Sequence, residues 1–196
     1  MNITMDYMTI SNFLPEQPFG QYAGELHGFD NNDISTVEKK IQYVWKLESL
    51  NAMRLSQEQK LQFARHIISL EIPNSTICGN TNDEDYFSLV ERLATGHGIK
   101  KSNSNSELYL ISAASKYCGH HNRKYPFYDE NNRKMLKILG YPDCYHNFTD
   151  FVRAFKDIQQ KNGLEKLTLR ELDFYLWLES KKAMKNQGTV LCAFRQ

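Results

Sequence analysis

The first 38 residues of this 196-residue chain contain no lysine and no arginine, although the whole chain carries 24 of these residues. The 23 aspartates and glutamates bring the formal net charge to only +1. The charges are unevenly placed: residues 1–34 contain five acidic residues, whereas residues 99–137 contain eight Lys/Arg against three Asp/Glu. The sequence therefore indicates an acidic beginning and a basic central segment, which the near-neutral total conceals.

Cysteines are few and scattered, and long apolar runs are missing. The four cysteines, Cys78, Cys118, Cys144 and Cys192, form no C-x-x-C pair. They predict neither a disulfide framework nor a zinc ribbon, so we expect free thiols. No segment approaches 18 consecutive apolar residues, and the N-terminus lacks the basic and apolar regions of a signal peptide. We therefore expect a cytoplasmic protein without a membrane span.

Hydrophobic residues make up 41% of the chain and aromatic residues 12%, which is enough for a packed core. Three segments have the form of a capping box, in which a hydroxyl and a side chain three residues later satisfy free backbone N–H groups. They are Ser35-x-x-Glu38, Ser56-x-x-Gln59 and Thr168-x-x-Glu171. Apolar residues then recur at helical spacing, most clearly at Phe148, Phe151, Val152, Phe155 and Ile158.

These signals predict an all-α protein, a compact multi-helix globule of about seven helices. Helices are expected to begin at Ser35 and Ser56, and others to cover residues 83–95, 107–118, 129–140, 148–161 and 168–185. Residues 100–106 are predicted as a loop, and residues 188–196 as a short strand or an extended cover. Residues 1–34 are predicted as an irregular acidic arm and residues 35–196 as one helical domain, whose candidate site lies at residues 112–141.

Lys116 is the first candidate for chemistry. On a helix it shares a face with Tyr109, Ser112 and Ala113, so an ammonium group projects from a surface that is otherwise apolar or small. Partial desolvation lowers the pKa of a lysine and makes its amine a nucleophile, able to form a Schiff base with a sugar C1′. The alternative, which residue type alone favours, is a solvated lysine or a phosphate contact.

Asp129 follows Pro126-Phe127-Tyr128 and is predicted to open a helix. A carboxylate at that position meets free N–H groups and the positive end of the helix dipole. The simplest interpretation is an N-cap. A cap also holds the side chain rigidly at the mouth of a helix, which suits a catalytic carboxylate, so the two roles are compatible. The acidic Glu171 and Asp173 suit the helix dipole in the same way, and a second catalytic carboxylate there is less favoured.

A basic cluster surrounds these two residues: Lys100, Lys101, Arg123, Lys124, Arg133, Lys134 and Lys137. Such a cluster neutralises phosphates, and Tyr117, Tyr125 and Tyr128 are candidates for stacking on an extruded base. The alternative is an ordinary charged helix face. His120 and His121 are expected just after a helix C-terminus, as caps or DNA contacts. The pairs Cys118-x-His120 and Cys144-x-His146 fit no zinc-finger spacing, so we expect no metal.

The arrangement around Lys116 and Asp129 resembles one protein family. A helix that contributes Lys116, a short turn with Pro126, and Asp129 opening the next helix are similar to the helix-hairpin-helix DNA glycosylases, particularly the 8-oxoguanine type. The resemblance implies that Lys116 attacks the sugar carbon of a flipped-out damaged nucleotide and that Asp129 supports the cationic transition state. The segments SKYCGHHNRKYPFYD and LRELDFYLWLESK more closely resemble a group of uncharacterised bacterial proteins of this size, which implies no function.

The leading hypothesis is a DNA-binding base-excision glycosylase/lyase without a cofactor. Lys116 and Asp129 are its catalytic residues, the basic cluster holds the phosphates, and Tyr128, His120 and His121 line the pocket. DNA is favoured over RNA, and the acidic arm is available to mask the basic cluster or bind a protein. The alternative is a non-enzymatic helical adaptor, of the kind found in phages and mobile elements. A metal-dependent nuclease is less favoured because no D-x-x-x-E-x-K array is present.

Overall fold

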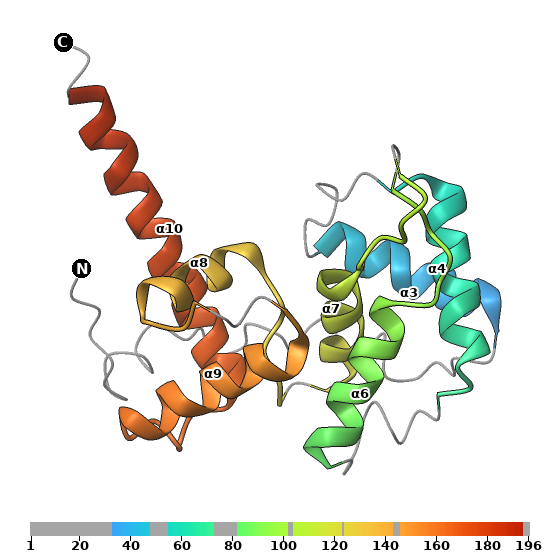
Figure 1. The fold of residues 1–196 in the computed structure, drawn as a ribbon, viewed down its shortest axis with the longest axis horizontal. Coiled ribbons are helices and arrows are strands. Elements are labelled where there is room, and N and C mark those ends of the chain that lie inside the picture. Colours follow the sequence, from blue (N-terminus) through green and yellow to red (C-terminus); the bar gives the residue numbers. More distant parts are fainter. Residues whose placement is uncertain are drawn as a thin grey trace. The chain divides into compact units, whose positions relative to one another are not determined.

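The computed structural model describes residues 33–47, 55–72, 82–101, 104–122, 124–142 and 146–193 (Figure 1). Within these residues the chain forms seven helices, and its only β-type pairing is an isolated bridge between Lys100 and Glu107. The all-α class predicted from the sequence is therefore confirmed. The predicted acidic arm of residues 1–34 lies outside the described residues except for its last two.

The chain divides into two compact units. The N-terminal unit is Phe19–Arg123, and the C-terminal unit is Lys124–Gln196 together with Met1–Pro18, which lies outside the described residues. The N-terminal unit contains α3 (Ile34–Leu47), α4 (Gln57–Ser69), α6 (Asp83–Ala94) and α7 (Ile111–His121). The C-terminal unit contains α8 (Glu130–Ile138), α9 (Phe148–Lys161) and α10 (Leu169–Ala193). The boundary falls inside residues 112–141, the predicted site segment.

Two of the three predicted capping boxes are confirmed. The Ser56 hydroxyl accepts from the Gln59 N–H at 3.1 Å, and the Gln59 side chain accepts from the Ser56 N–H at 2.9 Å. Thr168 and Glu171 make the same reciprocal pair at the start of α10. The Ser35 box is wrong, because the Asp33 carboxylate caps α3. It accepts from the Thr36 N–H at 2.9 Å, and Ser35 lies within the first turn.

The core of the N-terminal unit lies where α3 packs against α4 and α7, and α6 packs against α7. Trp45 of α3 meets the ring of Phe63 of α4 edge-on, with ring centroids 6.1 Å apart. α7 presents a run of small side chains, and Ala113, Ala114 and Ser115 are all 0% exposed. Small side chains let neighbouring helices approach closely, and this explains the small-sided segment of the sequence.

The core of the C-terminal unit lies where α8 and α9 pack against α10 (Figure 1). The predicted apolar stripe of α9 is buried at all five positions, including Phe148, Phe151 and Phe155. Full burial of each such side chain stabilises the fold by roughly 1.5–3 kcal/mol. The first half of α10 is buried along only part of its surface. Its residues Leu172, Tyr175 and Leu176 are buried, whereas Phe174 and Trp177 are partly exposed.

Two expectations about helix bounds are wrong. α7 begins at Ile111 rather than at residue 107, because the preceding backbone bonds across a turn: Leu108 N–H donates to the Ile99 carbonyl at 2.8 Å and Leu110 N–H to the Ala94 carbonyl at 2.9 Å. Its end is also later, so His120 and His121 are its last two residues. In the tail, α10 continues to Ala193 in place of a strand. A single glycine, Gly188, weakens a helix without necessarily ending it.

Candidate functional site

Lys116 lies in the middle of α7 and is 5% exposed. Its neighbours Ser115 and Tyr117 are also buried, so this stretch of α7 is packed against other parts of the protein. The predicted face with Tyr109 does not form, because Tyr109 precedes the helix and donates its hydroxyl to Glu91 Oε2 at 2.5 Å. Burial of the lysine agrees with the desolvation that its predicted chemistry needs, although a structural lysine also accounts for it.

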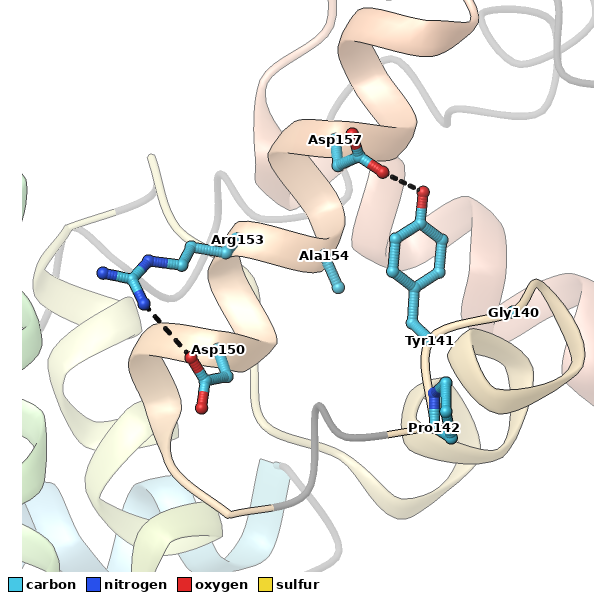
Figure 2. Close-up of a pocket in the computed structure, with 7 residues that line it drawn as sticks. All are labelled: Gly140, Tyr141, Pro142, Asp150, Arg153, Ala154 and Asp157. Carbon is cyan, nitrogen blue, oxygen red and sulfur yellow. Dashed lines mark hydrogen bonds and ion pairs between the residues drawn. The ribbon is translucent and has the colours of Figure 1, made fainter.

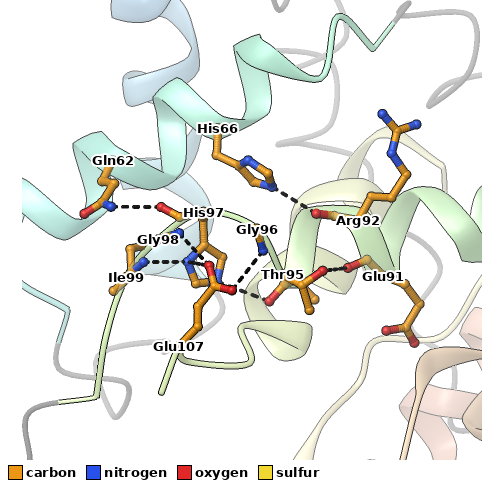
Figure 3. Close-up of polar contacts among 11 residues, drawn as sticks. Gln62, His66, Glu91, Arg92, Thr95, Gly96, His97, Gly98, Ile99 and Glu107 are labelled. Atoms are coloured by element: carbon orange, nitrogen blue, oxygen red, sulfur yellow. Dashed lines mark hydrogen bonds and ion pairs between the residues drawn. The ribbon is translucent and has the colours of Figure 1, made fainter. Parts of the chain in front are cut away.

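A tight turn between α6 and α7 sets where α7 begins (Figure 3). Gly96 and Gly98 both have φ of +73°, a conformation that L side chains rarely adopt. Their N–H groups donate to the two oxygens of Glu107, at 3.1 Å from Gly96 and 2.5 Å from Gly98. Gln62 of α4 donates to the His97 carbonyl at 2.9 Å. The turn is thereby fastened to both α4 and the residues that lead into α7.

His97 lies at the centre of this turn and is buried. The Ile99 N–H donates to Nδ1 at 3.1 Å, so Nε2 carries the proton and donates to the Ala94 carbonyl at 3.2 Å. Burial lowers the pKa of His97, and the nearby Glu107 opposes that shift. Burial disfavours the charge of Glu107, but the N–H groups of Gly98 and Gly96, with His97, still hold the pKa of this carboxyl below its usual value.

We expect acid to destabilise the N-terminal unit through His97. Because the pKa of His97 is lower in the folded state, the unfolded chain takes up a proton first, and stability falls as the pH drops below 6.5. The slope from this group cannot exceed about 1.4 kcal/mol per pH unit. His97→Gln should flatten the slope. Urea unfolding at pH 7 and pH 5, followed by the fluorescence of Trp45 in a Trp177→Phe background, measures it. An equal slope in the variant would contradict the assignment.

Asp129 is the N-cap of α8, as predicted. Its Oδ1 accepts from the Asn131 N–H at 2.8 Å, and the side chain is half-buried. α8 begins at the next residue, Glu130. Asp129 belongs to the C-terminal unit and Lys116 to the N-terminal unit. The predicted meeting of the amine and the carboxylate therefore stays a prediction.

Asp173 of α10 forms a buried polar cluster with the turn that carries Asp129. The Phe127 N–H donates to Asp173 Oδ2 at 3.2 Å, and the Asn132 side-chain amide donates to the Asp173 carbonyl at 3.2 Å and to its carboxylate. Arg170 pairs with the same carboxylate, and its guanidinium lies 3.2 Å from the centroid of the Phe127 ring. From the sequence, Asp173 was expected to suit the helix dipole, and a catalytic carboxylate there was less favoured. The signal available in the sequence is Arg170 three residues before Asp173, directly ahead of the apolar run Phe174 to Leu178.

Burial raises the pKa of Asp173 to about 6. Arg170 and the Phe127 N–H act against this shift, and the Asp129 carboxylate adds to it. This pKa in the folded state lies above 3.8, the ordinary value for an aspartate, so between these two pH values the folded protein holds a proton that the unfolded chain has released. The contribution of Asp173 to stability is therefore largest below pH 3.8 and decreases as the pH rises to about 6.

The other predicted site residues are divided between the two units. In the N-terminal unit Lys100 and Lys101 are exposed, His120 is half-buried and His121 is buried. The His121 ring packs on the ring of Tyr117, with centroids 5.3 Å apart. Arg123 lies outside the described residues. Among the predicted contacts of this unit that the structure describes, Lys100 and Lys101 are the ones well exposed for phosphate binding.

In the C-terminal unit, Lys124 and Lys134 are exposed, whereas Arg133 is half-buried and pairs with Glu130 at 2.9 Å. Tyr128 is 4% exposed and packs on Phe151, with ring centroids 4.8 Å apart. Tyr117 and Tyr125 are buried as well, at 1% and 0%. The three tyrosines considered for stacking are therefore core residues in this structure.

One described pocket lies within the C-terminal unit, between the end of α8 and α9 (Figure 2). Its volume is about 360 Å³, and its lining consists of Gly140, Tyr141, Pro142, Asp150, Arg153, Ala154 and Asp157. Arg153 pairs with Asp150 at 3.2 Å, and the Tyr141 hydroxyl donates to Asp157. Asp157 also pairs with Lys161 at 2.6 Å. None of the predicted site residues lines this pocket.

No group of three or more His, Cys, Asp or Glu in the described parts of the chain is arranged to hold a metal ion. Of the four cysteines, the structure describes the side chain of Cys118, a buried free thiol whose pKa is raised by burial. None of the described helices has the length and apolar composition of a transmembrane span.

The helices define an all-α protein, and comparison with known proteins gives its family. The chain belongs to the HI_0787_N family, whose model, an N-terminal domain, matches residues 13–125. The match ends close to the boundary between the two units. A protein of Haemophilus influenzae strain Rd, described as uncharacterized, is 36% identical over 173 residues, which cover 83% of this chain and 75% of the relative. No solved structure is significantly similar to the chain.

Proposed function

We propose that the protein is a DNA-binding, base-excision glycosylase/lyase of the cytoplasm, with Lys116 as its nucleophile and Asp129 as its supporting carboxylate. The observation that supports this most is the placement of Lys116, a primary amine that is 5% exposed on a helix of small side chains. In the reaction, the amine adds to the sugar C1′ while the glycosidic bond breaks and the base leaves. Ring opening and proton loss then give an imine between Lys116 and the sugar.

Exposed lysines in both units supply the electrostatic part of binding. Lys100 and Lys101 are exposed beside the turn that precedes α7, and Lys124, Lys134 and Lys137 are exposed in the C-terminal unit. Each phosphate that such a lysine neutralises releases counterions, so affinity should fall as salt rises. A double-stranded DNA partner is favoured, and the acidic residues 1–34 are proposed to contact a protein partner. No cofactor is needed for the imine chemistry.

Borohydride trapping tests the proposal. The wild-type protein, incubated with duplexes that contain an abasic site or an oxidised guanine, is expected to give a covalent adduct after reduction, because borohydride reduces the imine to a stable amine. Lys116→Ala should give none, since no other amine is predicted to reach C1′. Gel electrophoresis measures the adduct.

A matched control shows whether the loss of any surface lysine lowers the adduct yield. Lys182→Ala removes another lysine, one that is exposed on α10 and outside the basic cluster. Its adduct yield should equal that of the wild type. If the wild type forms no adduct with any of these duplexes, or if Lys116→Ala is trapped equally well, the lyase mechanism is wrong.

The burial of Tyr117, Tyr125 and Tyr128 favours a second candidate, a non-enzymatic helical adaptor. With these three rings buried, the predicted site offers less to stack on an extruded base. An adaptor would bind its protein or nucleic-acid partner through surface charge. Charge reversal at Lys100 and Lys101 that abolishes partner binding, while Lys116→Ala leaves binding intact and no adduct forms, would support the adaptor.

A further inference from the structure

We infer that Asp173 is a positioning residue for Asp129, because from α10 it holds the chain on both sides of the turn that presents the Asp129 carboxylate. Its catalytic consequence rests on the proposed function, but the positioning itself does not. All the residues involved belong to the C-terminal unit. Nothing in the sequence resemblance assigns this role to Asp173.

The first contact lies two residues before Asp129. The Phe127 N–H donates to Asp173 Oδ2 at 3.2 Å, and both residues are at least 96% buried. The Phe127 side chain is fixed as well, because the Arg170 guanidinium lies 3.2 Å from its ring centroid and also pairs with Asp173. Backbone and side chain of Phe127 are thus held by one pair of charges on the first turns of α10.

The second contact lies three residues after Asp129. The Asn132 side-chain amide donates to the Asp173 carbonyl at 3.2 Å and to the Asp173 carboxylate. Asn132 is 1% exposed, and its Oδ1 is a buried oxygen without a hydrogen-bond partner. The orientation of this amide is therefore set by its two bonds to Asp173. A buried acceptor left unsatisfied costs free energy, so stability alone does not account for an asparagine at this position.

Between these two contacts, the Asp129 carboxylate accepts from the Asn131 N–H at Oδ1, at 2.8 Å. That bond fixes the carboxylate relative to α8, and Asp173 fixes the turn and the first residues of α8 relative to α10. The position of the carboxylate within the C-terminal unit therefore depends on Asp173. A displacement of about 1 Å at a reacting group can lower a rate by roughly 100-fold.

The experiment compares Asp173→Asn and Asn132→Ala with Phe155→Leu, a core change elsewhere in the same unit. Two quantities are measured in each full-length variant: the single-turnover rate of borohydride adduct formation at saturating abasic DNA, and the hydrogen-exchange protection of the Asn131 amide. We expect the rate to fall by about 100-fold in Asp173→Asn with little change in DNA affinity. Asn131 protection should fall by about ten-fold, while Phe155→Leu keeps both quantities near the wild-type values.

The possible outcomes distinguish the positioning role of Asp173 from the proposed lyase function. If the wild type forms no adduct, the proposed function fails, and the exchange of the Asn131 amide alone decides the positioning role. If the wild type is trapped and Asp173→Asn keeps both its rate and its Asn131 protection, the positioning role is wrong. Equal losses in Phe155→Leu would also overturn it, because they would show a general effect of stability. If Asp173→Asn fails to fold, the same comparison is made with Asn132→Ala, which keeps the Arg170–Asp173 pair.

Discussion

Asp173→Ala is expected to lower the free energy of unfolding of the C-terminal unit by about 3–5 kcal/mol at pH 7. The change removes the carboxylate that contacts the Arg170 guanidinium inside the unit, where Arg170 is 8% and Asp173 2% exposed. Removing one member of a buried pair leaves the cost of burying the other charge without its compensation. The N–H of Phe127 loses its acceptor at the same time, and the side-chain amide of Asn132 keeps only the Asp173 backbone carbonyl.

The matched control for this prediction lies on the same helix. Glu179 and Lys182 form an ion pair with the same three-residue spacing, 2.6 Å between Oε1 and Nζ, but the Lys182 side chain is 49% exposed, against 10% for Arg170. Glu179→Ala should cost only about 0–1 kcal/mol, because water already solvates such pairs. Urea unfolding followed by Trp177 fluorescence in a Trp45→Phe background measures both variants. If Asp173→Ala costs no more than Glu179→Ala, the cluster does not stabilise this unit.

Phe151→Ala is expected to destabilise the C-terminal unit by a similar amount, about 3–5 kcal/mol. Phe151 is 0% exposed and lies at the centre of an aromatic cluster, with ring centroids 4.8 Å from Tyr128, 5.1 Å from Phe155 and 6.4 Å from Phe148. Truncation removes the buried ring and leaves a cavity that rigid neighbours cannot fill. The contact with Tyr128 ties this core to the turn that precedes Asp129.

Hydrogen exchange measured by mass spectrometry tests this prediction. Peptides from residues 148–182 should exchange faster in Phe151→Ala than in the wild type. Ile138→Ala is the control, because Ile138 is a large apolar residue of the same unit that is 56% exposed. It should change stability by no more than about 0.5 kcal/mol. If these peptides exchange no faster in Phe151→Ala than in Ile138→Ala, the Phe151 ring does not stabilise the core of the unit.

The candidate site shows how far sequence reasoning reaches. Asp129 was predicted as an N-cap, and the structure confirms this role. The prediction was possible because a capping side chain accepts from a backbone N–H only two or three residues further along the chain. The role of Asp173 could not be predicted in this way. Its partners Phe127 and Asn132 lie 46 and 41 residues away, and no periodicity or motif connects such positions. Glu107 was missed for the same reason, since its carboxylate folds back on Gly96 and Gly98.

The sequence by itself determined the all-α class, the cap of α4 at Ser56 and the buried stripe of α9, since each follows from interactions within a few residues of the chain. Only the tertiary structure decided that α7 begins at Ile111, that Lys116 is buried, and that Asp173 holds the turn before α8. These features depend on contacts between segments far apart in sequence. Helix propensity and capping are local, whereas burial and long-range hydrogen bonds exist only once the helices have packed.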